Sequence, residues 1–137
     1  TDSDDGEIYV IDTTKIPRLP DSEEDPIKTI ISIGGSPSQG AVDPIHEIVY
    51  LSGVGGVLSY DYQTKTPGRD SSYYIIPGGD IQNDLFSGVA VDEAKGLLYV
   101  CFFTGDRIKV LDLNDDFTVV KEIAGSDGTQ SIYLTTE

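Results

Sequence analysis

The chain has 137 residues, of which 24 are Asp or Glu and 9 are Lys or Arg, so its formal net charge is −15 at neutral pH. This length fits a single domain with its own core, and the charge disfavours nucleic acid and anionic membrane surfaces as partners. The lone cysteine, Cys101, excludes an internal disulfide, and no apolar run approaches the ~20 residues that span a bilayer.

Short runs rich in Val, Ile, Tyr, Phe and Leu alternate with Gly, Asp, Pro and Ser along the whole chain, and helical periodicity is missing. This pattern predicts strands joined by turns. The predicted strands are, in chain order, 7–12, 27–33, 39–43, 47–52, 57–62, 72–77, 87–92, 97–103, 107–113, 117–124 and 130–135. The expected fold class is therefore all-β.

The sequence repeats itself at an interval of 49 residues. SQGAVDPIHEIVYLS at 38–52 returns as SGVAVDEAKGLLYVC at 87–101, so that Asp43 and Tyr50 match Asp92 and Tyr99. The strand that follows ends in Asp at 12, 61 and 112. A period near 50 with about four strands per unit is typical of β-propeller blades. Several strands are apolar on both faces, as blades stacked between neighbours require.

These boundaries predict one propeller segment: a partial blade at 1–35, blades at 36–79 and 80–125, and the start of a next blade at 126–137. Closed propellers have typically about 4–8 blades. We therefore expect the chain to belong to a larger propeller, or to assemble with further copies that complete it. The residues expected to be buried are Val42, Val49, Val91, Leu98, Ile108 and Val110.

The pattern G-x-A-V-D followed by [IL]-[VL]-Y-[LV] resembles the NHL and YVTN class of propeller repeats. SGVAVDEAKGLLYVCFFTGDRIKVLDLNDDFTVVKEIAG at 87–125 carries it best, and the resemblance extends over most of residues 6–135. It implies the propeller fold. Propellers of this class include lactonases, strictosidine synthase relatives, dehydrogenase subunits and extracellular recognition proteins, so the resemblance implies no single activity.

The repeated polar residues favour structural roles over catalysis. Asp43 and Asp92 follow the first strand of each blade, where a carboxylate can accept from amides two residues on. His46 is the only histidine and occupies the turn position of Lys95, which indicates an exposed residue and leaves no Ser-His-Asp arrangement. Cys101 aligns with Ser52 on an inner strand and is expected to be a buried, inert thiol. No catalytic residue is predicted.

Acidic clusters are the remaining candidate sites. Asp80, Asn83 and Asp84 form one predicted calcium-binding loop, and Asp2, Asp4 and Asp5 form a second, because oxygen ligands grouped on loops suit Ca²⁺. The insertion at 13–26 contains Asp21, Glu23, Glu24 and Asp25 between prolines. This insertion is a candidate partner-binding loop, with a solvated excursion as the alternative.

Two functions follow from these features. The first is an extracellular or surface propeller that binds a protein or sugar, or acts as a scaffold, and that assembles with further copies or with the rest of a longer chain. The second is a fragment of a metal-dependent propeller enzyme resembling a lactonase. Weakly polar residues at the starts of the inner strands, Gln39, Gly88 and Gln130, favour binding over catalysis.

Overall fold

The structure, a computed structural model, describes residues 6–16, 26–32, 36–68, 74–77, 85–125 and 128–135. Within these residues the regular elements are strands, apart from the 3-10 turns η1 (Thr13–Lys15) and η2 (Phe103–Gly105). The all-β prediction is confirmed. The chain divides into two compact units, Thr1–Ser36 and Pro37–Glu137.

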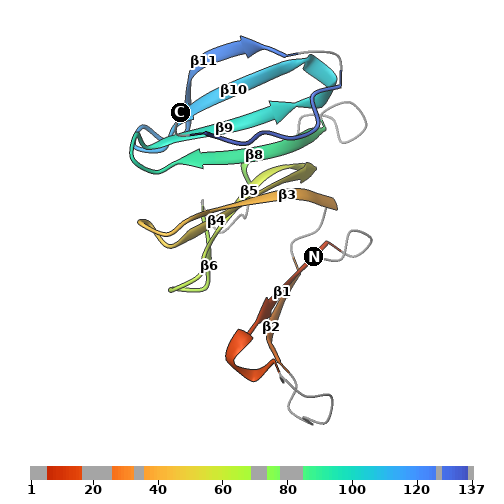
Figure 1. The fold of residues 1–137 in the computed structure, drawn as a ribbon, viewed down its shortest axis with the longest axis vertical. Coiled ribbons are helices and arrows are strands. Elements are labelled where there is room, and N and C mark those ends of the chain that lie inside the picture. Colours follow the sequence, from red (N-terminus) through yellow and green to blue (C-terminus); the bar gives the residue numbers. More distant parts are fainter. Residues whose placement is uncertain are drawn as a thin grey trace. The chain divides into compact units, whose positions relative to one another are not determined.

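The first unit contains a two-stranded antiparallel sheet, β1 (Glu7–Ile11) and β2 (Ile27–Ser32), shown in Figure 1. Tyr9 lies opposite Ile30 in this pair. Ile11 and Ile30 are 50% and 51% exposed. Because two strands alone bury little apolar surface, such a sheet is marginally stable without further strands.

The second unit contains two sheets built from consecutive hairpins (Figure 1). The first sheet comprises β3 (Ser36–Asp43), β4 (Ile48–Val54), β5 (Gly56–Asp61), β6 (Thr66–Pro67) and β7 (Tyr74–Pro77). The second comprises β8 (Phe86–Asp92), β9 (Leu97–Phe102), β10 (Arg107–Asp112) and β11 (Thr118–Ala124). Both β6 and β7 pair with β5. They form the outer strand of that sheet in two pieces, where the sequence predicted one strand at 72–77.

The sequence repeat is also a repeat of backbone geometry. Glu47 and Gly96, 49 residues apart, adopt left-handed conformations with φ of 60° and 64° in the turns after β3 and β8. Their carbonyl oxygens accept from equivalent amides, Tyr62 N at 3.0 Å and Leu113 N at 2.8 Å. The two sheets are therefore copies of one blade.

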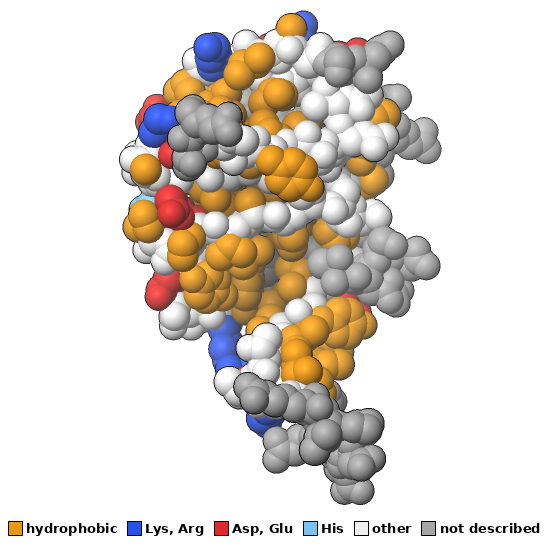
Figure 2. Space-filling model, viewed as in Figure 1, with side chains coloured by type: hydrophobic (Ala, Val, Ile, Leu, Met, Phe, Trp, Pro, Cys, Tyr) orange, Lys and Arg blue, Asp and Glu red, His pale blue; other side chains and the backbone are white. Residues whose placement is uncertain are grey.

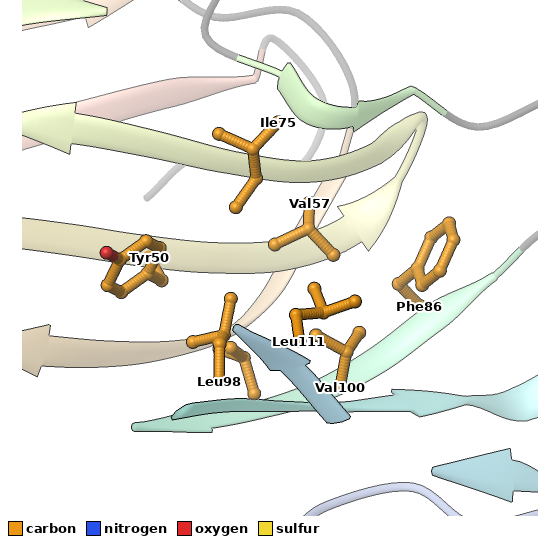
Figure 3. Close-up of a cluster of buried hydrophobic side chains, with 8 residues drawn as sticks. Tyr50, Val57, Ile75, Phe86, Leu98, Val100 and Leu111 are labelled. Atoms are coloured by element: carbon orange, nitrogen blue, oxygen red, sulfur yellow. The ribbon is translucent and has the colours of Figure 1, made fainter. Parts of the chain in front are cut away.

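A hydrophobic cluster joins these two blades (Figure 3). Its members come from both sheets and are at most 4% exposed: Tyr50, Val57, Ile75, Phe86, Val89, Leu98, Val100 and Leu111. Leu98 lies opposite Leu111 on β10 and opposite Val91 on β8. Because each sheet contributes one face, the cluster holds the blades together as a single packed body.

Burial follows the prediction at some positions only. Leu98 and Val110 are buried, at 0% and 3% exposure, whereas Val49, Val91 and Ile108 are only partly buried. The prediction for Val42 is wrong, because this side chain is 55% exposed. Its neighbour Ala41 packs against the cluster, and alternation along β3 turns Val42 to the opposite face. Val91, at the equivalent position of the next blade, packs against the cluster instead.

The predicted strand at 130–135 is not a strand in the structure. Residues 128–135 run without regular ladder pairing and are attached to the blades by side-chain hydrogen bonds. Ser87 Oγ donates to the Thr129 carbonyl at 2.6 Å, and Gln39 Nε2 donates to the Ile132 carbonyl at 3.2 Å. A strand needs a partner backbone, and the described chain offers this segment none.

Candidate functional site

The inner strands of the two blades, β3 and β8, run in the same direction (Figure 1), so their first residues lie at one end of the second unit. A cavity of about 480 Å³ opens there. Its polar lining comes from Ser38, Gln39, Ser87, Gln130 and Ser131, and its apolar lining from Leu85, Phe103 and Tyr133. We call it the inner-strand cavity. Its size lies within the usual range for small-molecule sites, about 300–1,000 Å³.

The serine hydroxyls of this cavity are oriented by the backbone. Ser38 Oγ donates to the carbonyl oxygens of Ser52 and Phe86, each at 3.3 Å, and so connects the two blades. Ser87, 8% exposed, donates to Thr129. A hydroxyl carries one proton and two lone pairs. Both oxygens therefore retain acceptor capacity after their protons are used inside the protein.

A glycine permits the close approach of the C-terminal segment to β8. A Cβ atom at Gly88 would lie 2.7 Å from Gln39 Oε1 and 2.9 Å from the Ser131 Cα. Both distances are shorter than a carbon atom tolerates, and a backbone atom cannot rotate away. Gly88 therefore lets Gln130 and Ser131 form one wall of the cavity.

A second hollow of about 280 Å³ continues along the inner strands and shares Gln39 and Tyr133 with the inner-strand cavity. Its other lining residues are apolar: Gly40, Ala41, Val42, Val89, Ala90, Val91, Ile132 and Leu134. The inner strands of the two blades thus line a groove. The inner-strand cavity is its polar end, and the rest of the groove is lined mainly by apolar side chains.

None of the described residues that line the inner-strand cavity is charged. In Figure 2, the charged side chains of the second unit lie mostly toward the left of the view, and apolar side chains occupy much of its middle. An uncharged site in a protein of net charge −15 is a local departure from the overall composition.

The turns after the inner strands are held by the predicted aspartates. Asp43 Oδ1 accepts from the amides of Ile45 and His46 at 3.0 and 3.1 Å, and Asp92 Oδ1 accepts from the Lys95 amide at 3.1 Å. The other oxygen of each carboxylate faces a cation or imidazole: His46 Nδ1 at 2.7 Å in the first turn, Lys95 Nζ at 2.8 Å in the second. The structural role of these aspartates is confirmed.

The same device recurs where the third strand of each repeat ends. Asp12, Asp61 and Asp112 each accept from the backbone amide two residues on, at 3.0, 2.9 and 2.8 Å. The 49- and 51-residue spacings of these aspartates in the sequence are therefore the spacings of a turn. They mark the architecture and not a site.

These surroundings shift several pKa values, among them those of Asp43, Tyr50 and Cys101. Burial raises the pKa of Asp43, but hydrogen bonds from the His46 side chain and backbone outweigh it, so the pKa is lowered below 3.8. Burial, with the Asp43 charge nearby, raises the pKa of Tyr50 to about 12. Burial also raises the pKa of the Cys101 thiol, which is 0% exposed. This thiol is buried as predicted.

The site residues predicted from the sequence lie outside the described residues. This applies to the predicted calcium ligands Asp2, Asp4, Asp5, Asp80, Asn83 and Asp84, and to the acidic loop residues Asp21, Glu23, Glu24 and Asp25. Among the described residues, no three His, Cys, Asp or Glu side chains come together in a way that could hold a metal ion. No helix in the described part of the chain has the length and apolar character to cross a membrane.

Sequence reasoning did not identify the inner-strand cavity. The match of Ser38 to Ser87 at the repeat interval was visible, as was the polar character of Gln39 and Gln130. The packing of the two blades and the path of the C-terminal segment bring these residues together with Phe103 and Tyr133. Neither can be read from the sequence.

No protein-family model matches the chain, and no curated protein matches it in sequence. Solved structures do match it. Sqt1 from Saccharomyces cerevisiae is 10% identical with a TM-score of 0.66 over 90% of this chain. Apo AztD from Citrobacter koseri is 19% identical (TM-score 0.62, 92% of this chain), and hydrazine synthase from Kuenenia stuttgartiensis is 18% identical (TM-score 0.54, 84%).

These matched structures are β-propellers, and the propeller fold predicted from the repeat is confirmed. The chain spans 29–32% of the length of the three matched proteins. At identities this low, the likeness concerns the fold alone.

Proposed function

We propose that this chain is part of a larger propeller of the NHL or YVTN type, and that it serves as a binding scaffold with the inner-strand cavity as its binding site. The single observation that carries this role is the cavity itself. It combines uncharged hydrogen-bonding side chains with two aromatic residues, Phe103 and Tyr133, which is the usual composition of a recognition site. We further propose an extracellular or surface location, for which the acid-rich composition is the motive.

The proposal of a larger propeller is supported by uncovered apolar surface. Ile11 and Ile30 on the hairpin of the first unit are half exposed, and Val42 and Leu134 are 55% and 43% exposed. Apolar rows of this kind normally mark surfaces that another element covers. The rest of a longer polypeptide is one such cover, and a second copy that completes the open blade is the other.

The acidic loops extend the proposal. Calcium at Asp80, Asn83 and Asp84, or at Asp2, Asp4 and Asp5, would relieve the mutual repulsion of a chain with net charge −15. Asp21, Glu23, Glu24 and Asp25 would offer a basic partner a compact acidic surface. The motive for both is charge and composition alone.

The alternative is a fragment of a metal-dependent, lactonase-like enzyme. Such an enzyme gathers carboxylates or amides from several blades around one ion. Among the described residues, no three His, Cys, Asp or Glu side chains gather in a way that could hold an ion, so no observation favours this alternative over binding.

Two measurements test the proposed function. First, a library of small neutral, cationic and anionic fragments is screened against the full-length protein by amide NMR, with a panel of lactones assayed in parallel with added Ca²⁺ or Zn²⁺. We expect fragments to shift the signals of Gln39, Ser87 and Ser131 without lactone turnover. Turnover, or a library that leaves these signals unmoved, refutes the binding role.

Second, sedimentation of residues 1–137 alone tests the incomplete propeller. We expect association or aggregation despite the high net charge, because exposed apolar rows outweigh screened repulsion at short range. A soluble, well-folded monomer would show that these surfaces need no cover.

A further inference from the structure

We infer that the inner-strand cavity takes a neutral, polyhydroxylated ligand, a mono- or disaccharide. This inference rests on the binding role proposed above and narrows it to one chemical class. Three features of the cavity support the saccharide inference. They are the direction of the hydrogen bonds that its serine hydroxyls donate, the absence of charge among its described lining residues, and its two aromatic side chains.

The serine oxygens select for ligands that donate hydrogen bonds. The Ser38 proton is directed to backbone carbonyls at 3.3 Å and the Ser87 proton to the Thr129 carbonyl at 2.6 Å. These two oxygens therefore present only lone pairs to the cavity. A ligand rich in O–H groups satisfies them, whereas a phosphate, sulfate or carboxylate offers acceptors alone and leaves them unpaired.

Two exposed polar side chains supply the hydrogen-bond donors that the serines Ser38 and Ser87 do not. Gln130 and Ser131 are exposed on the wall formed by the C-terminal segment, and each supplies both donors and acceptors. A sugar hydroxyl both donates and accepts, so adjacent hydroxyls of one ring match this alternation. The Gln39 amide is not available in the same way, because its Nε2 holds the Ile132 carbonyl at 3.2 Å and its Oε1 is buried.

Charge excludes the common ionic ligands. None of the described lining residues is Lys, Arg or His, so none of them attracts an anion by its charge, and the net charge of −15 repels one at longer range. None is Asp or Glu, so an ammonium ligand would enter without a counter-ion. A neutral ligand is neither repelled by the net charge nor in need of a counter-ion.

The aromatic residues supply the apolar contact that a sugar ring needs. Phe103 is partly buried and Tyr133 is 79% exposed, so one ring lies in the wall and the other at the rim. An exposed tyrosine presents a flat apolar face with a polar tip. One face of a pyranose ring carries several C–H groups and packs against such a surface, while its hydroxyls reach the serines.

The experiment is a titration of the full-length protein, followed by amide NMR and calorimetry. The probes are glucose, N-acetylglucosamine, maltose and cellobiose, with methyl phosphate and tetramethylammonium as charged probes. We expect at least one saccharide to bind with millimolar or better affinity and to shift the signals of Ser38, Ser87 and Ser131, with no shift from methyl phosphate.

Variants of Tyr133 test the aromatic contact without risk to folding, because this side chain is 79% exposed. Tyr133→Ala is expected to weaken saccharide binding about tenfold, and Tyr133→Phe to retain most of it because the ring remains. Tyr62→Ala is the matched control: Tyr62 is also exposed, at 36%, and does not line the cavity. Equal affinity in Tyr133→Ala and Tyr62→Ala would overturn the aromatic contact and with it the inference.

The outcomes separate this inference from the proposed function. If tetramethylammonium, methyl phosphate or an uncharged fragment without hydroxyls binds at these serines while every saccharide fails, the saccharide inference is wrong and the binding scaffold stands. If neither the saccharides nor the fragment library shifts these signals, both are wrong.

Discussion

Replacing Leu98 with alanine tests whether the hydrophobic cluster between the two blades holds the second unit together. Leu98 is 0% exposed and lies between Val91 and Leu111 within its own sheet. It also belongs to the cluster that includes Tyr50 and Val57 from the other sheet. The substitution therefore removes contacts within one blade and between two.

The magnitude follows from burial. Leu→Ala deletes three carbon atoms that are fully removed from water, a transfer cost of about 2.4 kcal/mol at about 0.8 kcal/mol each. The cavity left behind adds to this, since two sheets locked by their own hydrogen bonds collapse poorly around a void. We expect a loss of about 3–5 kcal/mol in the free energy of unfolding.

The assay is urea unfolding at low protein concentration, followed by far-UV circular dichroism and by tyrosine fluorescence, since the chain has 8 Tyr and no Trp. With a slope of about 1.5 kcal/mol per molar urea, the midpoint should fall by about 2–3 M. Val120→Ala on β11 is the control, because Val120 is 54% exposed and its truncation should cost less than about 1 kcal/mol. Equal midpoints for the two variants would refute the packing of these blades through Leu98.

Three further predictions concern the turns and loops. Asp43→Asn should destabilise the protein at neutral pH, and its difference from wild type should shrink as the pH falls below 3.8. The reason is that the lowered pKa of Asp43 makes its carboxylate stabilising above that value and lost below it; a difference that stays constant on acid titration would contradict this. Gly96→Ala should cost about 1–2 kcal/mol in thermal or urea unfolding, because Gly96 has a φ of 64°, a left-handed conformation that is unfavourable for alanine, and because the added Cβ atom would displace the Asn114 side chain. Glu47→Gly, at φ 60° in the equivalent turn, should have the opposite sign, and two losses of equal size would exclude backbone strain as the cause. Millimolar calcium should raise the melting temperature relative to excess chelator if the acidic loops bind it, and identical midpoints would leave them as solvated surface.

The turns illustrate how far local sequence determines structure. An aspartate followed by free amides forms its hydrogen bonds within three residues, so Asp43, Asp92 and Asp112 have the same role wherever the blades lie. The exposed position of His46 was predicted on the same basis, from its match to Lys95 in the equivalent turn.

Strand positions were also largely predictable, because alternation and turn residues are local signals. The strands that were predicted wrongly are those whose formation depends on a neighbouring strand to pair with. The segment at 130–135 has the composition of an inner strand but pairs with no backbone among the described residues. The outer strand of the first blade is divided between β6 and β7, both of which pair with β5.

The sequence by itself determined the all-β class, the 49-residue blade and the turns between strands, since each depends on residues close together in the chain. Only the tertiary structure decided which face of each blade is covered and where the cavity lies. Val42 and Val91 occupy the same repeat position, yet one is 55% exposed and the other packs against the cluster. Likewise Ser38, Ser87 and Ser131 meet because two blades pack and the C-terminal segment crosses to Gln39. Burial and convergence depend on contacts between residues up to 93 positions apart, and no local pattern encodes them.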